Sequence, residues 1–213
     1  MKKIVKPLFY LTVLLLALCL AACSNNHEQT PDTTQQQETT PSGEQQPPQE
    51  GSATLVAYFS RTGNTETVAQ MIAEQLGAEL YAITPAEAYP QDYQQALAVA
   101  EQEQADNARP QLAESDINIS AYATVLIGYP IWYGYEPMLI RTFIETYDFS
   151  GKVVAPFCTS GGSTISASEQ SLAELLPEST LLTGLTVNGS SAGDAASQVT
   201  SWLIDNGLLS GKE

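Results

Sequence analysis

The chain has 213 residues, with 24 acidic and eight basic side chains and a formal net charge of −16. This balance argues against a nucleic-acid-binding protein and against direct adhesion to anionic lipid, and it favours partner surfaces that are basic. Solubility alone would also account for surface carboxylates. The segment from Ala53 to Gly207 has the size of a single domain, and no internal repeat or second linker interrupts it.

The first 22 residues are typical of a secretion signal. Three lysines precede an apolar run from Pro7 to Leu20, which is too short to span a membrane. The run ends at Leu20-Ala21-Ala22-Cys23, which resembles the lipobox of bacterial lipoproteins, where the cysteine is lipidated and becomes the mature N-terminus. The alternative is a signal that is cut elsewhere, with Cys23 incidental. The resemblance implies a chain anchored by lipid to the bacterial cell membrane on its extracytoplasmic side.

Residues 23–52 are predicted to carry the lipid and to form a disordered tether. They consist mainly of Gln, Thr, Glu and Pro and contain no large apolar residue, so they cannot bury enough surface to offset the entropy of ordering. Loss of the signal would remove three of the eight basic residues and leave a net charge of about −19. The folded domain is expected over residues 53–213.

Two residue types limit the chemistry of the domain. The only histidine, His27, lies in the tether, which excludes a catalytic Ser-His pair or a histidine-ligated metal site in the folded part. Cys19 leaves with the signal and Cys23 carries the lipid, so Cys158 remains alone and no disulfide framework can form. Cys158 follows an apolar run and is predicted to be a buried small hydrophobic residue rather than a reactive thiol.

Apolar strands alternate with helical patterns along the domain. In chain order, the expected strands span 54–59, 79–83, 124–129, 152–158 and 181–187. The expected helices span about 65–76, 93–106, 138–147, 168–176 and 192–206. This alternation predicts an α/β fold with a doubly wound, five-stranded parallel sheet, joined by right-handed crossovers and covered by helices on both faces.

The first strand leads into a helix through residues 59–65, Phe-Ser-Arg-Thr-Gly-Asn-Thr. At a helix N-terminus, unpaired N–H groups and the positive end of the helix dipole attract an anion, and Gly63 lets the backbone come close to it. Neither a Lys after the glycine nor a G-x-G-x-x-G spacing is present, which disfavours a triphosphate with magnesium. The loop therefore predicts a binding site for one terminal phosphate, which neutral donors would mainly hold, with Arg61 as the nearby charge. The alternative is an ordinary capped turn.

Two further loops are expected at the same edge of the sheet. Residues 129–135 follow the third strand and are rich in aromatic side chains, and residues 159–168 follow the fourth strand and are polar. Ligands of such sheets bind outside the carboxyl ends of the strands. The three loops are therefore predicted to converge on one pocket.

The three loops resemble those of the flavodoxin-like family, and the resemblance covers essentially all of Ala53 to Gly207. Residues 60–65 are similar to the family's S/T-x-T-G-x-T phosphate loop, residues 128–134 to the loop along the isoalloxazine ring, and residues 158–163 to the loop at the pyrimidine edge and ribityl chain. The resemblance implies FMN as the cofactor. The residues that it implies in FMN binding are Ser60, Arg61, Thr62, Gly63, Asn64, Thr65, Pro130, Ile131, Trp132, Tyr133, Gly134, Thr159, Ser160, Gly161, Gly162 and Ser163.

The residue types of these loops fit FMN, which has an anionic phosphate at one end and a large flat ring at the other. Trp132 offers the largest stacking face, unless it is a core or interface aromatic. Tyr129, Tyr133 and Tyr135 are further candidates for neighbours of the ring. The glycines of the second and third loops allow close backbone approach or simply make turns. The third loop has no aromatic residue, unlike that of many electron-carrier flavodoxins, so one flavin face is expected to be open.

The resemblance leaves three functions to distinguish. The first is a membrane-tethered FMN protein that transfers electrons, with a redox partner that has a basic surface. The second is an NAD(P)H-dependent quinone or flavin reductase, in which the open face would admit a small quinone or flavin acceptor. The third is a non-enzymatic lipoprotein that binds another phosphate-bearing ligand or a partner protein. The intact phosphate loop and Trp132 weigh against the third.

Overall fold

The computed structural model describes residues 53–114 and 116–211. The predicted signal, Cys23 and the whole predicted tether lie outside these residues. Within the described ranges, no helix combines the length and the apolar character needed to cross a bilayer. The strands are β1 (Ala53–Tyr58), β2 (Glu79–Ala82), β3 (Tyr122–Pro130), β4 (Val153–Ser160), β5 (Thr180–Leu181) and β6 (Leu185–Asn188). The helices are α1 (Asn64–Leu76), α2 (Tyr93–Ala105), α3 (Met138–Thr146), α4 (Ser166–Leu175) and α5 (Ala196–Asp205), with 3-10 turns η1 (Ile119–Ala121) and η2 (Gly189–Asp194).

The strands form one parallel sheet in the order β2-β1-β3-β4-β5, and β6 also pairs with β4. From β1 the chain moves outward to β2 and then returns to β3 on the other side of β1. The direction of winding therefore reverses between β1 and β3, which confirms the predicted doubly wound fold. At such a reversal the loops that follow the neighbouring strands separate and leave a crevice in which ligands bind.

The predicted fifth strand, 181–187, is interrupted. β5 pairs with the start of β4 and β6 with its end, and Leu182, Thr183 and Gly184 lie between them. Side chains form hydrogen bonds with the backbone groups at this break. Trp202 Nε1 donates to the Thr183 carbonyl at 2.7 Å, and the Gly184 N–H donates to Glu169 Oε1 at 2.6 Å. The strand can therefore leave the ladder here without leaving these polar groups unpaired.

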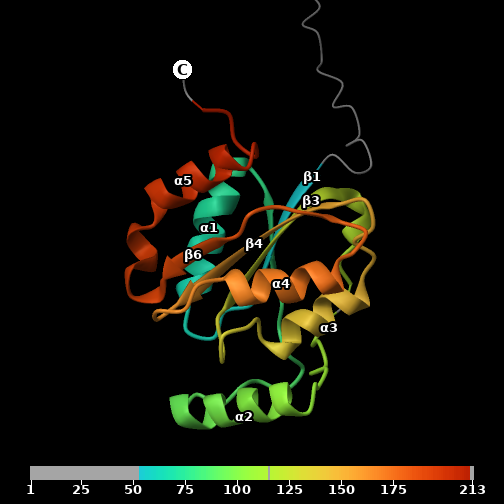
Figure 1. The fold of residues 1–213 in the computed structure, drawn as a ribbon, viewed down its shortest axis with the longest axis vertical. Helices are drawn as coiled ribbons and strands as arrows, with labels where there is room; N and C mark the ends of the chain where they lie inside the picture. Colours follow the sequence, from blue (N-terminus) through green and yellow to red (C-terminus); the bar gives the residue numbers. More distant parts are fainter. Residues whose placement is uncertain (1–52, 115, 212–213) are drawn as a thin grey trace, which may run out of the picture. The chain divides into compact units, whose positions relative to one another are not determined.

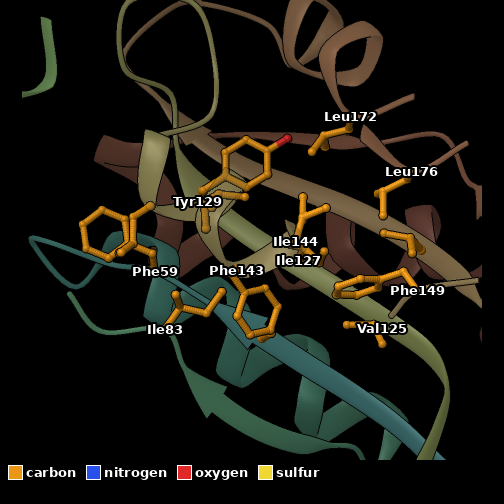
Figure 2. Close-up of a cluster of buried hydrophobic side chains, with 14 of the residues drawn as sticks. Phe59, Ile83, Val125, Ile127, Tyr129, Phe143, Ile144, Phe149, Leu172 and Leu176 are labelled. Carbon is orange, nitrogen blue, oxygen red and sulfur yellow. The ribbon is translucent and has the colours of Figure 1, made fainter. Parts of the chain in front are cut away.

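Helices cover both faces of the sheet (Figure 1). On one face, α1 and α5 pack around a cluster that includes Val56, Ile72 and Val199. On the other, α3 and α4 pack around a second cluster that includes Phe143 and Leu172, which Figure 2 shows. α3 is buried along an apolar stripe at helical spacing, so its position on the sheet follows from its sequence.

α2 differs from the other helices, because it lies at the bottom of Figure 1, apart from those that flank the sheet. Only Ala96 and Ala100 are buried along it. Segments 84–86 and 111–113, on either side of the helix, are joined by two backbone hydrogen bonds of 2.8 Å. The connection from β2 to β3 is therefore an excursion that carries α2, which we call the α2 excursion (residues 83–113).

The last predicted helix, 192–206, begins later than expected, because η2 precedes α5. The Asn188 side chain accepts hydrogen bonds from the Ser190 N–H at 2.9 Å and from the Ser190 hydroxyl at 2.7 Å. These bonds turn the chain tightly after β6 and favour a local turn over a regular helix. The turn forms a fourth loop at the carboxyl edge of the sheet.

Candidate functional site

The first loop leaves β1 after Tyr58 and enters α1 at Asn64. Gly63 takes a φ of +89°, in the left-handed region that favours glycine, and its N–H donates to Ser60 Oγ at 3.1 Å. Its carbonyl accepts the N–H of Thr67 at 2.9 Å and the Thr67 hydroxyl at 3.0 Å. No side chain of the described residues caps this end of α1. The first N–H groups of the helix are thus oriented as an anion site requires.

Thr159, at the end of β4, connects the three candidate loops. Its hydroxyl lies 2.8 Å from the hydroxyl of Thr65 in the first loop, and both threonines are buried. Its carbonyl accepts the N–H of Ile131 in the second loop at 2.9 Å, and it is paired in register with Pro130. The structure therefore brings the three loops together, as the parallel topology predicts. Thr65 lies beneath the surface, where its hydroxyl is already paired.

Arg61 extends from the first loop toward the α2 excursion. Its Nη1 donates to the Pro90 carbonyl at 3.4 Å and to the Gln91 carbonyl at 3.1 Å. The guanidinium carbon also lies 5.9 Å from the centre of the Tyr93 ring, within the range of a cation–π contact. These contacts connect the first loop to the start of α2, whereas the exposed side chains of Thr62 and Asn64 remain at the loop surface.

The other basic side chains of the described domain also contact protein groups. Arg109 pairs with Glu145, Arg141 pairs with Glu136, and Lys152 donates to the carbonyl of Tyr122. The donors that surround the first loop are therefore backbone amides, hydroxyls and a carboxamide. Such a set suits a phosphate that is held by many neutral donors.

The second loop is a tight hairpin. Trp132 and Tyr135 exchange two backbone hydrogen bonds, at 2.9 and 3.1 Å. The two residues between them both have positive φ, +50° at Tyr133 and +86° at Gly134, which identifies a type I′ turn. A left-handed conformation is unfavourable for an aromatic residue, so the turn imposes it on Tyr133. Tyr133 remains 46% exposed at the tip.

Trp132 is anchored through contacts with two aromatic rings. The indole meets Phe59 edge-to-face, with ring centres 5.4 Å apart, and meets Tyr89 in the same way at 4.9 Å. Edge-to-face packing fixes the plane of the indole. Because the side chain is only half-buried, part of it remains accessible. Trp132 is therefore both a partly packed aromatic residue and one with an accessible surface on which a flat ring could stack.

The third loop is closed by its own serine. Ser160 Oγ accepts the N–H of Gly162 at 3.0 Å and the N–H of Ser163 at 2.7 Å. At Gly161 and Gly162, a Cβ atom would meet no other atom within 4 Å, so neither glycine is required for packing within the protein. Both glycines are exposed, and the space beside them is open to a ligand.

A fourth loop, Asn188–Ser191, also lies at this edge, and it was absent from the sequence prediction. A Cβ atom on Gly189 would lie 3.1 Å from Asn64 Nδ2 and 3.9 Å from the Ser160 carbonyl. Gly189 thus lets the fourth loop approach both the first and the third. Its signal was an Asn-Gly-Ser-Ser run directly after the last strand, which the rule used for the other three loops would have identified.

Two side chains of the neighbouring strands are buried. Figure 2 shows Tyr129 among the buried side chains of the core, so it is a core residue, whereas Tyr133 and Tyr135 are exposed in the second loop. Cys158 is also buried, as predicted. Its burial raises the pKa of the thiol to about 11, which keeps it protonated and unreactive at neutral pH.

A cavity of about 650 Å³ lies within the α2 excursion, between segment 85–90 and α2. Its lining includes Tyr89 and Glu103, and the Tyr89 hydroxyl donates to Glu103 Oε2 at 2.8 Å. None of the predicted cofactor-binding residues lines it. It adjoins the candidate site through Tyr89, whose ring packs on Trp132, and through Pro90, whose carbonyl accepts a hydrogen bond from Arg61.

Comparison with known proteins agrees with this geometry. The flavodoxin family model matches residues 53–206. A Bacteroides uniformis protein described as a flavoprotein is 38% identical, with a TM-score of 0.66 over 73% of this chain and 99% of that one. A Bacteroides eggerthii protein described in the same way is 34% identical, with a TM-score of 0.64 over 74% and 99% of the two chains. A Lactobacillus acidophilus flavoprotein in complex with FMN is 25% identical, with a TM-score of 0.57 over 71% and 99%. No curated protein matches the chain in sequence.

Proposed function

This chain belongs to the flavodoxin family, and from that premise we propose that it binds FMN and transfers electrons. The observation that carries the proposal is the convergence at Thr159 of an uncapped helix N-terminus and a loop with a partly accessible tryptophan. These are the two features that a phosphate and a flat ring require. The Lactobacillus acidophilus relative in complex with FMN supports the choice of flavin.

Each part of FMN has a matching group of residues. The amides of residues 60–65 and the exposed Thr62 hydroxyl would hold the phosphate, and the hairpin of Trp132 and Tyr133 would lie along the ring. The open space beside Gly161 and Gly162 would admit the rest of the cofactor. Bound FMN would supply the redox chemistry, while the protein sets its access and its potential.

Absorbance and titration test this proposal directly. The domain from Ala53 onward has its own core and corresponds to nearly the whole of the related flavoproteins, so it can be studied alone. We expect a yellow protein that binds about one FMN per chain and that binds riboflavin more weakly, because riboflavin lacks the phosphate. A colourless domain that cannot be reconstituted with FMN would support the non-enzymatic alternative instead.

The electron-transfer role rests on the charge of the chain. A net charge of −16 favours a redox partner with a basic surface, because complementary charge steers association. Net negative charge would also disfavour an anionic reduced flavin and lower its potential. The rate of electron transfer to a basic partner should therefore fall as ionic strength rises. A rate that is insensitive to salt would contradict this assignment.

A reductase is the second candidate, because the third loop has no aromatic residue to cover the flavin. Residues 159–168 contain none, and Gly161 and Gly162 leave open space. An open face would admit a hydride donor and then a quinone or flavin acceptor. Steady-state oxidation of NADH and NADPH by the FMN-loaded domain, with several quinones, separates the two functions. Absence of turnover would exclude the reductase and leave electron transfer as the remaining candidate function.

We propose lipid anchoring at Cys23 on the basis of the preceding Leu-Ala-Ala and the short apolar run. The test is metabolic labelling of the full chain with a fatty acid, together with membrane fractionation. Cys23→Ser should abolish both the label and the membrane association. Cys158→Ser is the matched control, since that thiol is buried in the domain. Retention of the label in the Cys23→Ser variant would overturn the anchor.

A further inference from the structure

Glu136 follows the second-loop hairpin and carries a charge that the proposed flavin chemistry does not use. Its side chain is buried, and the residue is only 3% exposed. Its carboxylate accepts hydrogen bonds from Arg141 Nε at 2.9 Å, Ser171 Oγ at 2.6 Å and Ser168 Oγ at 2.5 Å. Burying a charge is costly unless it is paired and fully hydrogen-bonded, and this one is both.

The protons of this network all point toward Glu136. The Ser168 hydroxyl has one proton, and it donates this proton in a hydrogen bond to the nearby carboxylate. The Tyr129 hydroxyl, 2.8 Å from Ser168 Oγ, must therefore donate to that oxygen. On the other branch, Arg141 Nη2 donates to Ser171 Oγ at 2.7 Å, and Ser171 donates to the carboxylate. An ionised carboxylate is the acceptor in which both branches end.

The network joins the elements that carry the second and third loops. Tyr129 lies in β3 just before the second loop, and Glu136 lies just after it. Ser168 and Ser171 lie on α4, which follows the third loop, and Arg141 lies on α3. Figure 2 shows the Tyr129 hydroxyl directed toward the side on which Leu172 of α4 lies. Residues at both ends of the second loop are therefore hydrogen-bonded to α4, the helix that follows the third loop.

We propose that Glu136 is a positioning residue that holds the second and third loops in the one arrangement that receives the flavin. The proposal rests on the proposed FMN function and goes beyond it, because Glu136 has no predicted contact with the cofactor. Its role is to supply the acceptor at which the bonds from β3, α3 and α4 meet. A pocket that is pre-organised in this way binds without ordering its loops at the moment of association.

The chemistry of the carboxylate distinguishes it from a side chain of the same shape. In Glu136→Gln, the amide oxygen can still accept from Arg141 and Ser171, but its NH₂ group then faces Ser168. Ser168 must turn its proton toward Tyr129, whose own proton is left without an acceptor in the core. The substitution therefore keeps the volume but leaves one buried donor unpaired, a loss worth roughly a tenfold change in an equilibrium constant.

The first experiment compares FMN binding and amide hydrogen exchange in the wild-type domain and Glu136→Gln. We expect about tenfold weaker FMN binding, through faster dissociation, in line with one unpaired buried donor. In the absence of FMN, we expect faster exchange in residues 130–137 and 160–168 together. The matched control is Glu145→Gln, which neutralises a more exposed carboxylate of α3 that pairs with Arg109, and it should change neither measurement.

A double variant separates positioning from a general loss of stability. Tyr129→Phe removes the donor that Glu136→Gln leaves unpaired and keeps the ring in the core. The double variant still leaves one buried donor unpaired, because the Ser168 hydroxyl then has no acceptor, so it should bind FMN about as weakly as Glu136→Gln alone, whereas two independent defects would weaken binding further. If Glu136→Gln does not fold, Ser168→Ala carries the test, because it keeps the Glu136–Arg141 pair while cutting the link to Tyr129.

The proposal is overturned by unchanged FMN affinity together with unchanged exchange in Glu136→Gln, and also by additive losses in the double variant. Failure of the proposed function looks different, because the wild-type domain itself would then not bind FMN. The exchange measurement needs no cofactor, so it tests the positioning role even in that case. Faster exchange confined to one of the two loops would contradict the claim that the network couples them.

Discussion

The hydroxyl groups of Thr65 and Thr159 lie 2.8 Å apart in the buried base of the site, although the residues are 94 positions apart in the chain. Thr65 begins the helix that follows the first loop, and Thr159 lies in the strand that leads to the third. One side-chain hydrogen bond therefore sets the distance between the loop expected to bind the phosphate and the loop expected beside the ribityl chain. Neither hydroxyl is exposed to water, which makes the bond sensitive to the loss of either partner.

Replacing both threonines should therefore cost less stability than the sum of the two single replacements. Thr65→Val or Thr159→Val leaves a buried hydroxyl unpaired and should lower the free energy of unfolding by about 1–3 kcal/mol. The double variant removes both hydroxyls and should be more stable than the sum of the two losses implies. Urea unfolding of the domain without cofactor measures all three. Strictly additive losses would show that the two hydroxyls do not depend on each other.

A side chain at Gly189 should displace the side chain of Asn64. Gly189→Ala places a Cβ atom 3.1 Å from Asn64 Nδ2, so Asn64 must shift within the first loop. We expect FMN affinity to fall several-fold. Gly193→Ala is the matched control, because it lies in the same η2 turn and its Cβ would meet nothing within 4 Å. In an Asn64→Ala background, the effect of Gly189→Ala should shrink, and a full effect there would place its cause elsewhere.

Arg61 should contribute to the attachment of the α2 excursion more than to the phosphate. Its guanidinium is bonded to the carbonyls of Pro90 and Gln91, so Arg61→Gln should speed hydrogen exchange around residues 89–95. FMN and riboflavin affinities should change by the same factor, because the neutral donors of the first loop remain. Arg109→Gln, an exposed arginine with partners outside the three loops, serves as the control. If the preference for FMN over riboflavin collapses in Arg61→Gln, the arginine binds the phosphate directly.

Local patterns predicted the outline of the fold and the loops around the site. The first loop follows from an apolar strand, Gly63 and a helical repeat within a short stretch, and the structure has a helix N-terminus there. The break in the fifth strand could not be predicted in this way. The partners of its backbone groups are Trp202 and Glu169, which lie on the helices that follow and precede the strand in the chain and reach it only through tertiary packing. Side chains that act across the fold leave no periodic signal in the segment they alter.

The Glu136 network shows the same limit for function. Glu136 lies between an exposed tyrosine and a proline, and its position in the chain is typical of a surface loop. Ser168 and Ser171 are one helical turn apart, which alone indicates only a polar helix face. Their meeting depends on how α4 packs beside the second loop, a tertiary relationship. Likewise, the sequence offered Arg61 as the charge near a phosphate, and only the path of the α2 excursion reveals its carbonyl partners.

Glu103 should make the stability of the domain depend on pH. Burial raises the pKa of its carboxyl above the ordinary 4.5, although the hydrogen bond from Tyr89 favours the ionised form. A raised pKa means that the folded protein holds this proton more tightly than the unfolded chain. The contribution to stability is therefore full below pH 4.5 and is lost as the pH rises through the folded-state pKa.

The neutral variant Glu103→Gln should thus gain stability relative to the wild type as the pH rises from 4 to 7. The midpoint of urea unfolding, followed at several pH values with an unchanged slope, measures this difference. Tyr89→Phe provides the opposing check. It removes the bond that favours the ionised form, so its loss of stability relative to the wild type should grow over the same range. A constant difference between Glu103→Gln and the wild type across this range would show that the carboxyl has the same pKa in the folded and unfolded states.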